Sequence, residues 1–186
     1  ELKNSDLCGR YTGRIVHGVK IGPSPAWLKQ RLEVLGMNSI NNVVDVTNYV
    51  MMEMGQPMHA FDLANLSNAK ITIDTAKAGQ KFETLKKEIK TLAGFELMIS
   101  DGKGPVAMAG VIGGIDSGVS DSTTDIFLES ANFNQAAVRK ASRHHQIETD
   151  SAYRFSRGVS QQIPPLALER ATELILQVAG GQAVVQ

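Results

Sequence analysis

The chain has 186 residues, of which 42% are hydrophobic and 20% are charged, a balance typical of a globular protein with a core. Its 19 basic and 19 acidic side chains leave no net charge. Proteins that hold long nucleic acids alone are usually basic, so we expect contact with a short piece of nucleic acid at most. The single cysteine excludes an internal disulfide and a cysteine-rich metal site.

Two further features concern the setting of the chain. No apolar run reaches the length of a membrane helix, and the first residues lack the basic and apolar regions of a secretory signal peptide. We therefore expect a reducing, cytoplasmic environment and no membrane partner. The chain begins at Glu1 rather than at a methionine, which suggests a piece excised from a larger protein.

The first predicted elements are a strand and a helix. Residues 10–22 alternate loosely between apolar and polar, which indicates a strand. A helix is expected next, with Ser24 as its N-cap and Pro25 at its first position. Gly36 is expected to end this helix.

A second helix is predicted between Asn41 and Gly55. Its apolar residues follow helical spacing, although Val43–Val46 are also compatible with a strand. The methionines in this segment are interpreted as core filler rather than as part of a binding site. The apolar positions are Val43, Val46, Val50, Met51 and Met54.

The middle of the chain reads as β structure. Residues 68–100 contain short β-rich runs that are separated by Gly79 and Gly94, and the Gly-rich segment that follows is expected to form strand, turn and loop. The stretch TTDIFLES is predicted to be a buried strand that ends in the carboxylate of Glu129.

Two more helices complete the prediction. One is capped by Asn134, and the other starts near Pro164–Pro165 and ends at Gly180–Gly181. The pattern predicts a mixed α/β (α+β) fold over residues 1–186, with a mixed sheet and packed helices in one compact domain. The interleaving of helices and strands does not require an all-parallel, doubly wound sheet.

Glu129 is the first candidate site residue. It follows the apolar run Ile126–Leu128, and leaving a carboxylate unpaired in apolar surroundings costs several kcal/mol. Glu129 therefore needs a donor, which is either a protein group or a ligand hydroxyl. A structural bond to a backbone amide remains the alternative.

His59 is the second candidate, because it stands among small and apolar residues in GQPMHAFDL. A satisfied core histidine and a ligand-binding histidine are both compatible with this context. The four histidines lack the i, i+4 spacing of a zinc motif, so no metal site is predicted.

The Gly-rich segment Gly110–Gly118 lacks the Gly-Lys-Ser/Thr ending of a phosphate-binding loop. Its glycines allow either a ligand or another strand to approach the backbone closely.

Further along the chain, residues 139–157 carry many basic side chains, which makes this segment the best place for phosphate contacts, with a solvated surface as the alternative. Those basic residues include Arg139, Arg143, Arg154 and Arg157.

Four stretches of the chain, taken in order, resemble one family. They are VVDVTNYVMMEMGQPMHAFD, MAGVIGGIDSGVSDSTTDIFLESA, RKASRHHQIETDSAYRFSRGV and ALERATELILQVAGG. From about Cys8 to Gly181, they resemble the B3/B4 domain of the bacterial phenylalanyl-tRNA synthetase beta subunit. The resemblance implies that residues 1–186 form a single B3/B4-type domain within a longer beta chain.

In that family the domain hydrolyses tyrosine wrongly attached to phenylalanine-tRNA. The resemblance assigns His59 and Glu129 to the editing pocket, with Glu129 recognising the tyrosine hydroxyl. It assigns Gly113, Thr149 and Ser151 to the pocket lining. Ser151 stands where relatives often have alanine, and Asn38 stands where some relatives have arginine, which puts a charge contact to tRNA from that position in doubt.

The residues themselves support a simple chemistry. Since no nucleophile and base pair is evident, water is expected to attack directly, without a metal or a covalent intermediate, and backbone amides near Gly113–Gly114 are expected to hold the ester oxygen. The resemblance also implies the wider setting. No cofactor is expected in this domain, whereas ATP and Mg²⁺ serve the parent ligase. The expected partners are the acceptor end of tRNA(Phe), the alpha subunit and the rest of the beta chain, in a heterotetramer of two alpha and two beta subunits. A non-catalytic module that positions tRNA is the alternative function.

Overall fold

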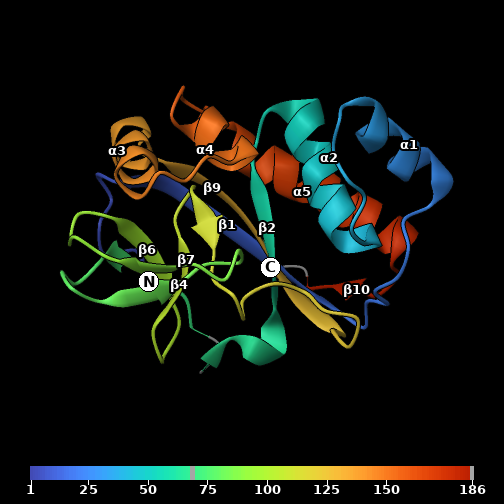
Figure 1. Cartoon of the computed structure of the whole chain (residues 1–186). Coiled ribbons are helices and arrows are strands. Elements are labelled where there is room, and N and C mark those ends of the chain that lie inside the picture. The colour runs from blue at the N-terminus through green and yellow to red at the C-terminus, as the bar shows by residue number, and fades with distance from the viewer. Residues whose placement is uncertain (68–69, 185–186) are drawn as a thin grey trace. The chain divides into compact units, whose positions relative to one another are not determined.

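The computed structural model describes residues 1–67 and 70–184. It has a mixed α/β fold with antiparallel strand pairs and helices, which confirms the predicted fold class (Figure 1). The contacts divide the chain into two compact units, which are described separately below. The first unit contains residues 1–11, 65–118 and 131–161, and the second contains residues 12–64, 119–130 and 162–186.

The second unit is built on a four-stranded sheet with the order β10-β1-β9-β2. Strands β2 and β9 pair antiparallel, as do β1 and β10. Three helices lie together on one side of this sheet (Figure 1). The strands are β1 (Cys8–His17), β2 (Met58–Asp62), β9 (Asp125–Phe133) and β10 (Gln182–Ala183), and the helices are α1 (Ala26–Val34), α2 (Asn42–Met54) and α5 (Ile163–Val178).

The core of the second unit lies between the sheet and these helices. Val16, Ala60, Ile126 and Leu128 project from the strands into one cluster with buried residues of α2 and α5. Because side chains alternate along a strand, the residues between them point to the other face. The helices therefore seal one face of the sheet and leave the other for His59 and Glu129.

Helix α2 has the ends that its sequence predicts. The side chain of Asn41 accepts hydrogen bonds from the N–H groups of Val43 and Val44, and Gly55 ends the helix with φ of 72°. A left-handed residue at this position favours glycine. The helical interpretation of Val43–Val46 is thus confirmed over the strand alternative.

The predicted start of α1 is wrong in its detail. Helix α1 begins at Ala26, Pro25 occupies the N-cap position, and no side chain caps the helix. The hydroxyl of Ser24 instead donates to the carboxylate of Asp45, 2.6 Å away. Asp45 is fully buried and also accepts from the backbone N–H of Ile40. A buried carboxylate that needs donors therefore takes Ser24 away from the helix end.

The first unit holds a second four-stranded sheet, β3-β6-β7-β8, and a two-stranded sheet, β4-β5, all antiparallel. The β unit predicted for residues 68–100 is confirmed, except that positions 68–69 lie outside the described residues. The short 3₁₀ helix η1 (Leu63–Asn65) follows β2. The strands are β3 (Thr72–Thr75), β4 (Lys81–Glu83), β5 (Ile89–Thr91), β6 (Leu97–Ser100), β7 (Pro105–Met108) and β8 (Ile112–Gly113), and the helices are α3 (Gln135–His145) and α4 (Asp150–Phe155).

The turn between β7 and β8 packs closely on the aromatic core of the first unit. Gly110 has φ of 69°, and a Cβ atom there would lie 2.9 Å from Phe155 and 3.1 Å from Phe133. These two rings are in edge contact, 5.1 Å between centroids. Glycine is therefore required both by the backbone conformation and by the space. This contact fixes the turn that precedes Gly113.

Candidate active site

His59 and Glu129 lie directly opposite each other on the antiparallel strands β2 and β9. Opposite residues in such a pair share one face of the sheet, with Cβ atoms about 4.5–5.5 Å apart. Their face is the one turned away from α2 and α5, because Ala60 and Leu128 occupy the helix-covered face. The structure therefore brings together the two residues on which the editing hypothesis depends.

The imidazole of His59 has unusual surroundings. Its side chain is half-buried, but its Nε2 atom is enclosed and has no hydrogen-bond partner among the residues that the structure describes. The ring of Phe61 makes an edge contact with it at 4.4 Å. Burial lowers the pKa of His59 from 6.5 to about 4. The imidazole is therefore neutral at physiological pH, and its Nε2 is a buried polar atom whose hydrogen-bonding capacity is unused in the described chain.

Glu129 is only 6% exposed, as expected for a carboxylate in a buried strand. The prediction that it ends the strand is wrong, because β9 continues to Phe133. The alternation of faces explains how a carboxylate follows the run Ile126–Leu128. Ile126 and Leu128 point to the helices, whereas Phe127 shares the other face with Glu129.

Aromatic rings complete this face in the second unit. Phe61 and Phe127 lie opposite each other, with ring centroids 6.2 Å apart. On β1, a Cβ atom at Gly13 would lie 2.2 Å from the ring of Phe127, so only glycine leaves room for that ring. Sequence reasoning missed these three residues. The alternation in MHAFD, once recognised as a strand, is the signal that places Phe61 beside His59.

Thr149 and Ser151 hold the start of α4 against the β7–β8 turn in the first unit. The Thr149 hydroxyl accepts from the N–H of Ala152 as N-cap and donates to the carbonyl of Val111, 2.8 Å away. The Ser151 hydroxyl donates to the carbonyl of Gly110, 3.1 Å away. Both hydroxyl protons are therefore engaged with the backbone, which argues against either residue as a nucleophile.

The structure gives different settings to the two glycines of the predicted lining. The N–H of Gly114 donates to the carbonyl of Val106 at 2.8 Å, so this amide is not available for an ester oxygen. A Cβ atom at Gly114 would also lie 2.7 Å from that carbonyl oxygen. Gly113 uses its own carbonyl to accept from Leu85. The expectation that both amides hold the ester is thus corrected for Gly114.

Three of the four predicted phosphate-binding arginines line one pocket of about 730 Å³ between α3 and α4. Arg139 donates to the carbonyl of Ser156, and Arg157 donates to that of Tyr153 and stacks on its ring at 3.5 Å. Arg154 does not line the pocket and pairs with Asp150 instead. The complete lining is Arg139, Ser142, Arg143, Glu148, Thr149, Asp150, Ala152, Tyr153, Ser156 and Arg157.

The pocket carries both signs of charge, since its three arginines stand beside Glu148 and Asp150. The backbone bonds aim the guanidinium groups of Arg139 and Arg157, and an aimed guanidinium recognises phosphate better than a mobile one.

In the part of the chain that the structure describes, no helix is long and apolar enough to cross a bilayer.

Comparison with known proteins places this chain in a family. Residues 7–180 match the model of the B3/4 domain. The phenylalanine–tRNA ligase beta subunit of Bdellovibrio bacteriovorus is 59% identical over 183 residues, which cover 98% of this chain and 22% of that protein. The corresponding subunit of Geobacter metallireducens is 50% identical over 97% of this chain and 23% of its own length.

A solved structure shows the same fold at lower identity. It is an N-terminal fragment of the phenylalanyl-tRNA synthetase beta subunit of Pyrococcus horikoshii, with a TM-score of 0.64 and 15% identity over 98% of this chain and 48% of that one. The fold and the sequence thus define a B3/4-type module, as the resemblance implied. The chain belongs to the B3/4 domain family of phenylalanine–tRNA ligase beta subunits, and it spans about a fifth of the curated relatives that it matches.

Proposed function

We propose that this chain is the editing domain of a phenylalanine–tRNA ligase and that it hydrolyses tyrosine from mischarged tRNA(Phe). The observation that carries the proposal is the pair His59 and Glu129 on one sheet face of the second unit, with the rings of Phe61 and Phe127 beside them. The neutral imidazole and the buried carboxylate are polar groups in largely apolar surroundings. Such surroundings suit a phenol better than a phenyl ring.

Glu129 supplies the selectivity in this proposal. Tyrosine differs from phenylalanine by one hydroxyl, and apolar walls alone discriminate poorly between them. A site built to bond a hydroxyl rejects the analogue that lacks it by roughly 10⁴–10⁵, because phenylalanine would displace water from a carboxylate without replacing its hydrogen bond. Glu129 is therefore assigned to the tyrosine hydroxyl.

His59 acts in this proposal by positioning rather than by taking a proton. With a pKa of about 4, the imidazole is a weak base at neutral pH. Its Nε2 is enclosed in the free protein, so we assign to substrate binding a turn of the ring that lets this atom accept a hydrogen bond from the attacking water or from a hydroxyl of the terminal ribose. Water then attacks the ester carbonyl directly, without a covalent intermediate; the bond to the ribose oxygen breaks, the proton of the water passes to that oxygen, and free tyrosine and uncharged tRNA are released.

The remaining site assignments follow from the resemblance. Gly113, Thr149 and Ser151 are proposed to line the substrate site, and Gly114 contributes backbone packing rather than an amide for the ester. The acceptor end of tRNA(Phe), the alpha subunit and the rest of the beta chain are the proposed partners in a cytoplasmic ligase of two alpha and two beta subunits. ATP and Mg²⁺ would serve aminoacylation elsewhere in that enzyme.

A second candidate function rests on the pocket between α3 and α4. Its aimed arginines, with the exposed ring of Tyr153, suit a sugar-phosphate backbone and an unstacked base. A module that only positions the tRNA end would need this pocket and would not need His59 or Glu129. The same assembled enzyme can distinguish the two functions.

The experiment compares Glu129→Ala and His59→Ala in the assembled ligase. We expect both variants to hydrolyse Tyr-tRNA(Phe) at least about 10² times more slowly than wild type, while charging with phenylalanine is retained. Glu33→Ala is a matched control, because Glu33 is an exposed surface carboxylate paired with Lys29. Wild-type hydrolysis by both site variants would reject the assignment and favour the tRNA-positioning module.

A further inference from the structure

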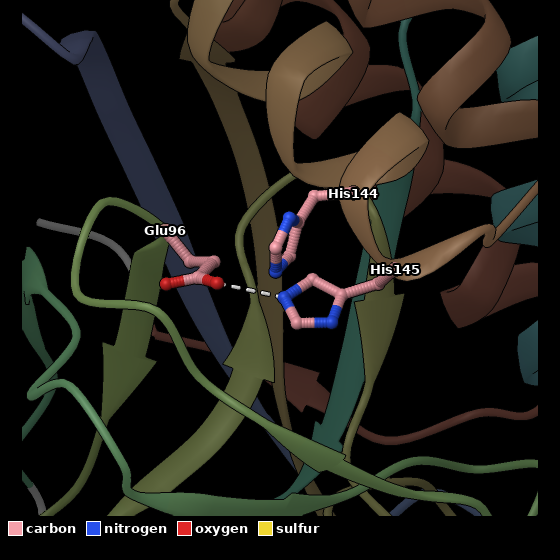
Figure 2. A group of neighbouring side chains, drawn as sticks. All are labelled: Glu96, His144 and His145. Atoms are coloured by element: carbon pink, nitrogen blue, oxygen red, sulfur yellow. Dashed lines mark hydrogen bonds and ion pairs between the residues drawn. The ribbon is translucent and has the colours of Figure 1, made fainter.

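The first unit contains a group of histidines and a glutamate that the editing site does not use. Glu96 directly precedes β6, and His144 and His145 are the last two residues of α3. One donor atom from each residue lies within 4.8 Å of the other two. Figure 2 shows the carboxylate and the two imidazole rings turned toward a common point.

Glu96 is the anchor of this group. Its carboxylate is fully buried, and it accepts the backbone N–H groups of Ala93 and Gly94 and a hydrogen bond at 2.7 Å shared with Nε2 of His145. Burial raises the pKa of Glu96, but these hydrogen bonds outweigh it and hold the pKa below its ordinary value. The result is an oriented anion whose direction is fixed before any ligand arrives.

The two histidines differ in exposure. His145 is 7% exposed, whereas His144 lies at the surface. Their rings are in edge contact at 4.8 Å, and His144 also contacts the ring of Phe95. No hydrogen bond joins the His144 imidazole to another residue in the described parts of the chain. The imidazole of His144 is therefore free to reorient, and the group of three side chains is open to solvent on the side of His144.

We propose that Glu96, His144 and His145 bind a divalent transition metal, with Zn²⁺ as the first candidate. Two imidazole nitrogens and one carboxylate oxygen, with water in the fourth position, form a known type of zinc site. Tetrahedral zinc with bonds of about 2.0–2.1 Å places its donors roughly 3.3 Å apart. The exposed His144 must therefore close in from within 4.8 Å, while His145 and Glu96, now hydrogen-bonded at 2.7 Å, must separate slightly. Imidazole donors favour Zn²⁺ over Mg²⁺ and Ca²⁺.

Binding changes the protonation of His145 in a defined way. Its Nε2 must present a lone pair to the metal, so the proton shared with Glu96 moves to Nδ1 or is released to water. The amides of Ala93 and Gly94 keep the carboxylate in place, which is the usual role of partners around a metal ligand. A bound ion would link the end of α3 to the segment before β6 and so stabilise the first unit.

The sequence predicted no metal because its histidines lack a zinc spacing. Neighbouring helix residues project about 100° apart, and the carboxylate that completes the group lies 49 residues away from His145. Only the packing of the α3 terminus against the turn before β6 reveals the third donor. The proposal therefore rests on contacts that no linear motif records.

The test is a titration of the metal-free protein with Zn²⁺ followed by calorimetry, and with Co²⁺ followed by visible absorption. We expect one equivalent of Zn²⁺, a rise in melting temperature that EDTA reverses, and the absorption of tetrahedral Co²⁺. His144→Ala should weaken Zn²⁺ binding by at least about 10-fold. It should change the melting temperature of the metal-free protein little, since the ring is exposed and its contacts are limited to the rings of Phe95 and His145.

His17→Ala is the matched control. His17 and Asp125 form an exposed histidine–carboxylate pair at 2.7 Å that has no third donor in the described chain. The control should bind Zn²⁺ as wild type does. Absence of one-to-one binding would overturn the proposal, and so would wild-type affinity in His144→Ala. Because these readouts need no tRNA, their failure is distinguishable from failure of the editing proposal.

Discussion

Each of the two units contains a buried carboxylate next to a histidine, and the two pairs are built differently. In the second unit, Glu129 and His59 are opposite one another on a sheet face, and Nε2 of His59 has no hydrogen-bond partner in the described chain. In the first unit, Glu96 and His145 are joined by a hydrogen bond at 2.7 Å, and backbone amides bind the carboxylate. The first pair keeps an acceptor for a ligand, whereas the second is already held together.

This difference matters because a buried polar atom without a partner costs free energy, about 1–3 kcal/mol. Such an atom is worth retaining where a substrate later supplies the partner. The Glu96 pair has its hydrogen bonds in the free protein and therefore contributes to stability before anything binds. We accordingly expect changes at the two pairs to separate into effects on activity and effects on folding.

The largest expected effect is on selectivity. Glu129→Gln should reduce the preference of the assembled ligase for hydrolysing Tyr-tRNA(Phe) over Phe-tRNA(Phe) by about 10² or more, because a neutral amide is a weaker acceptor for the tyrosine hydroxyl. The measurement is the ratio of single-turnover deacylation rates for the two esters. An unchanged ratio would show that Glu129 does not contact the hydroxyl.

The second effect is on the stability contributed by the pair Glu96 and His145. Glu96→Gln places a neutral amide among the backbone donors and beside His145, and we expect it to lower the free energy of unfolding by about 3 kcal/mol. Urea denaturation measures this change. Glu88→Gln is the control, since Glu88 is a surface partner of Lys90, and its loss should have little effect. Equal effects of the two variants would contradict the proposed role of Glu96.

How far the sequence predicted these features depends on how local they are. The cap of α3 at Asn134 and the end of α2 at Gly55 follow from single residues and are confirmed, whereas the cap of α2 at Asn41 was not predicted. Strand β2 was missed because its five residues follow Pro57 without a longer alternation. Helix α4 has six residues, too few for a helical pattern to stand out.

The site shows the same dependence on distance along the chain. A carboxylate after an apolar run identified Glu129, but its facing partner His59 lies 70 positions away, and a known family supplied that link. Glu96 was missed because its donors and its histidine partner become visible only in the fold. Sequence reasoning therefore found the residue types and left their pairing to the structure.

The third effect sharpens the description of the sheet face around His59 and Glu129. A Cβ atom in Gly13→Ala would meet the ring of Phe127 at 2.2 Å, and overpacking of this kind costs about 1–3 kcal/mol. Thermal unfolding should show the loss. In the double variant Gly13→Ala, Phe127→Leu we expect most of it to be recovered, because the shorter side chain removes the ring. Additive losses would mean that the two residues do not touch.

The smallest expected effect is on the pH dependence of stability, which should differ between the His59–Glu129 pair and the Glu96–His145 pair. Because the pKa of His59 is lowered from 6.5 to about 4 in the folded protein, the unfolded chain binds a proton first as the pH falls, and the folded protein loses stability through this group. Between pH 7 and pH 5.5 the loss should be about 1 kcal/mol, and His59→Gln should remove it.

The carboxylate of Glu96 affects stability in a lower range of pH than His59 does. Its folded pKa lies below 4.5, so its contribution is present above that value and is lost only as the pH falls further. Unfolding curves of wild type, His59→Gln and Glu96→Gln at pH 7, 5.5 and 4 therefore distinguish the two pairs. The imidazole proton resonances of His59 give a direct check, since titration near 6.5 would show that this ring is solvated and that the editing proposal has lost its neutral, enclosed nitrogen.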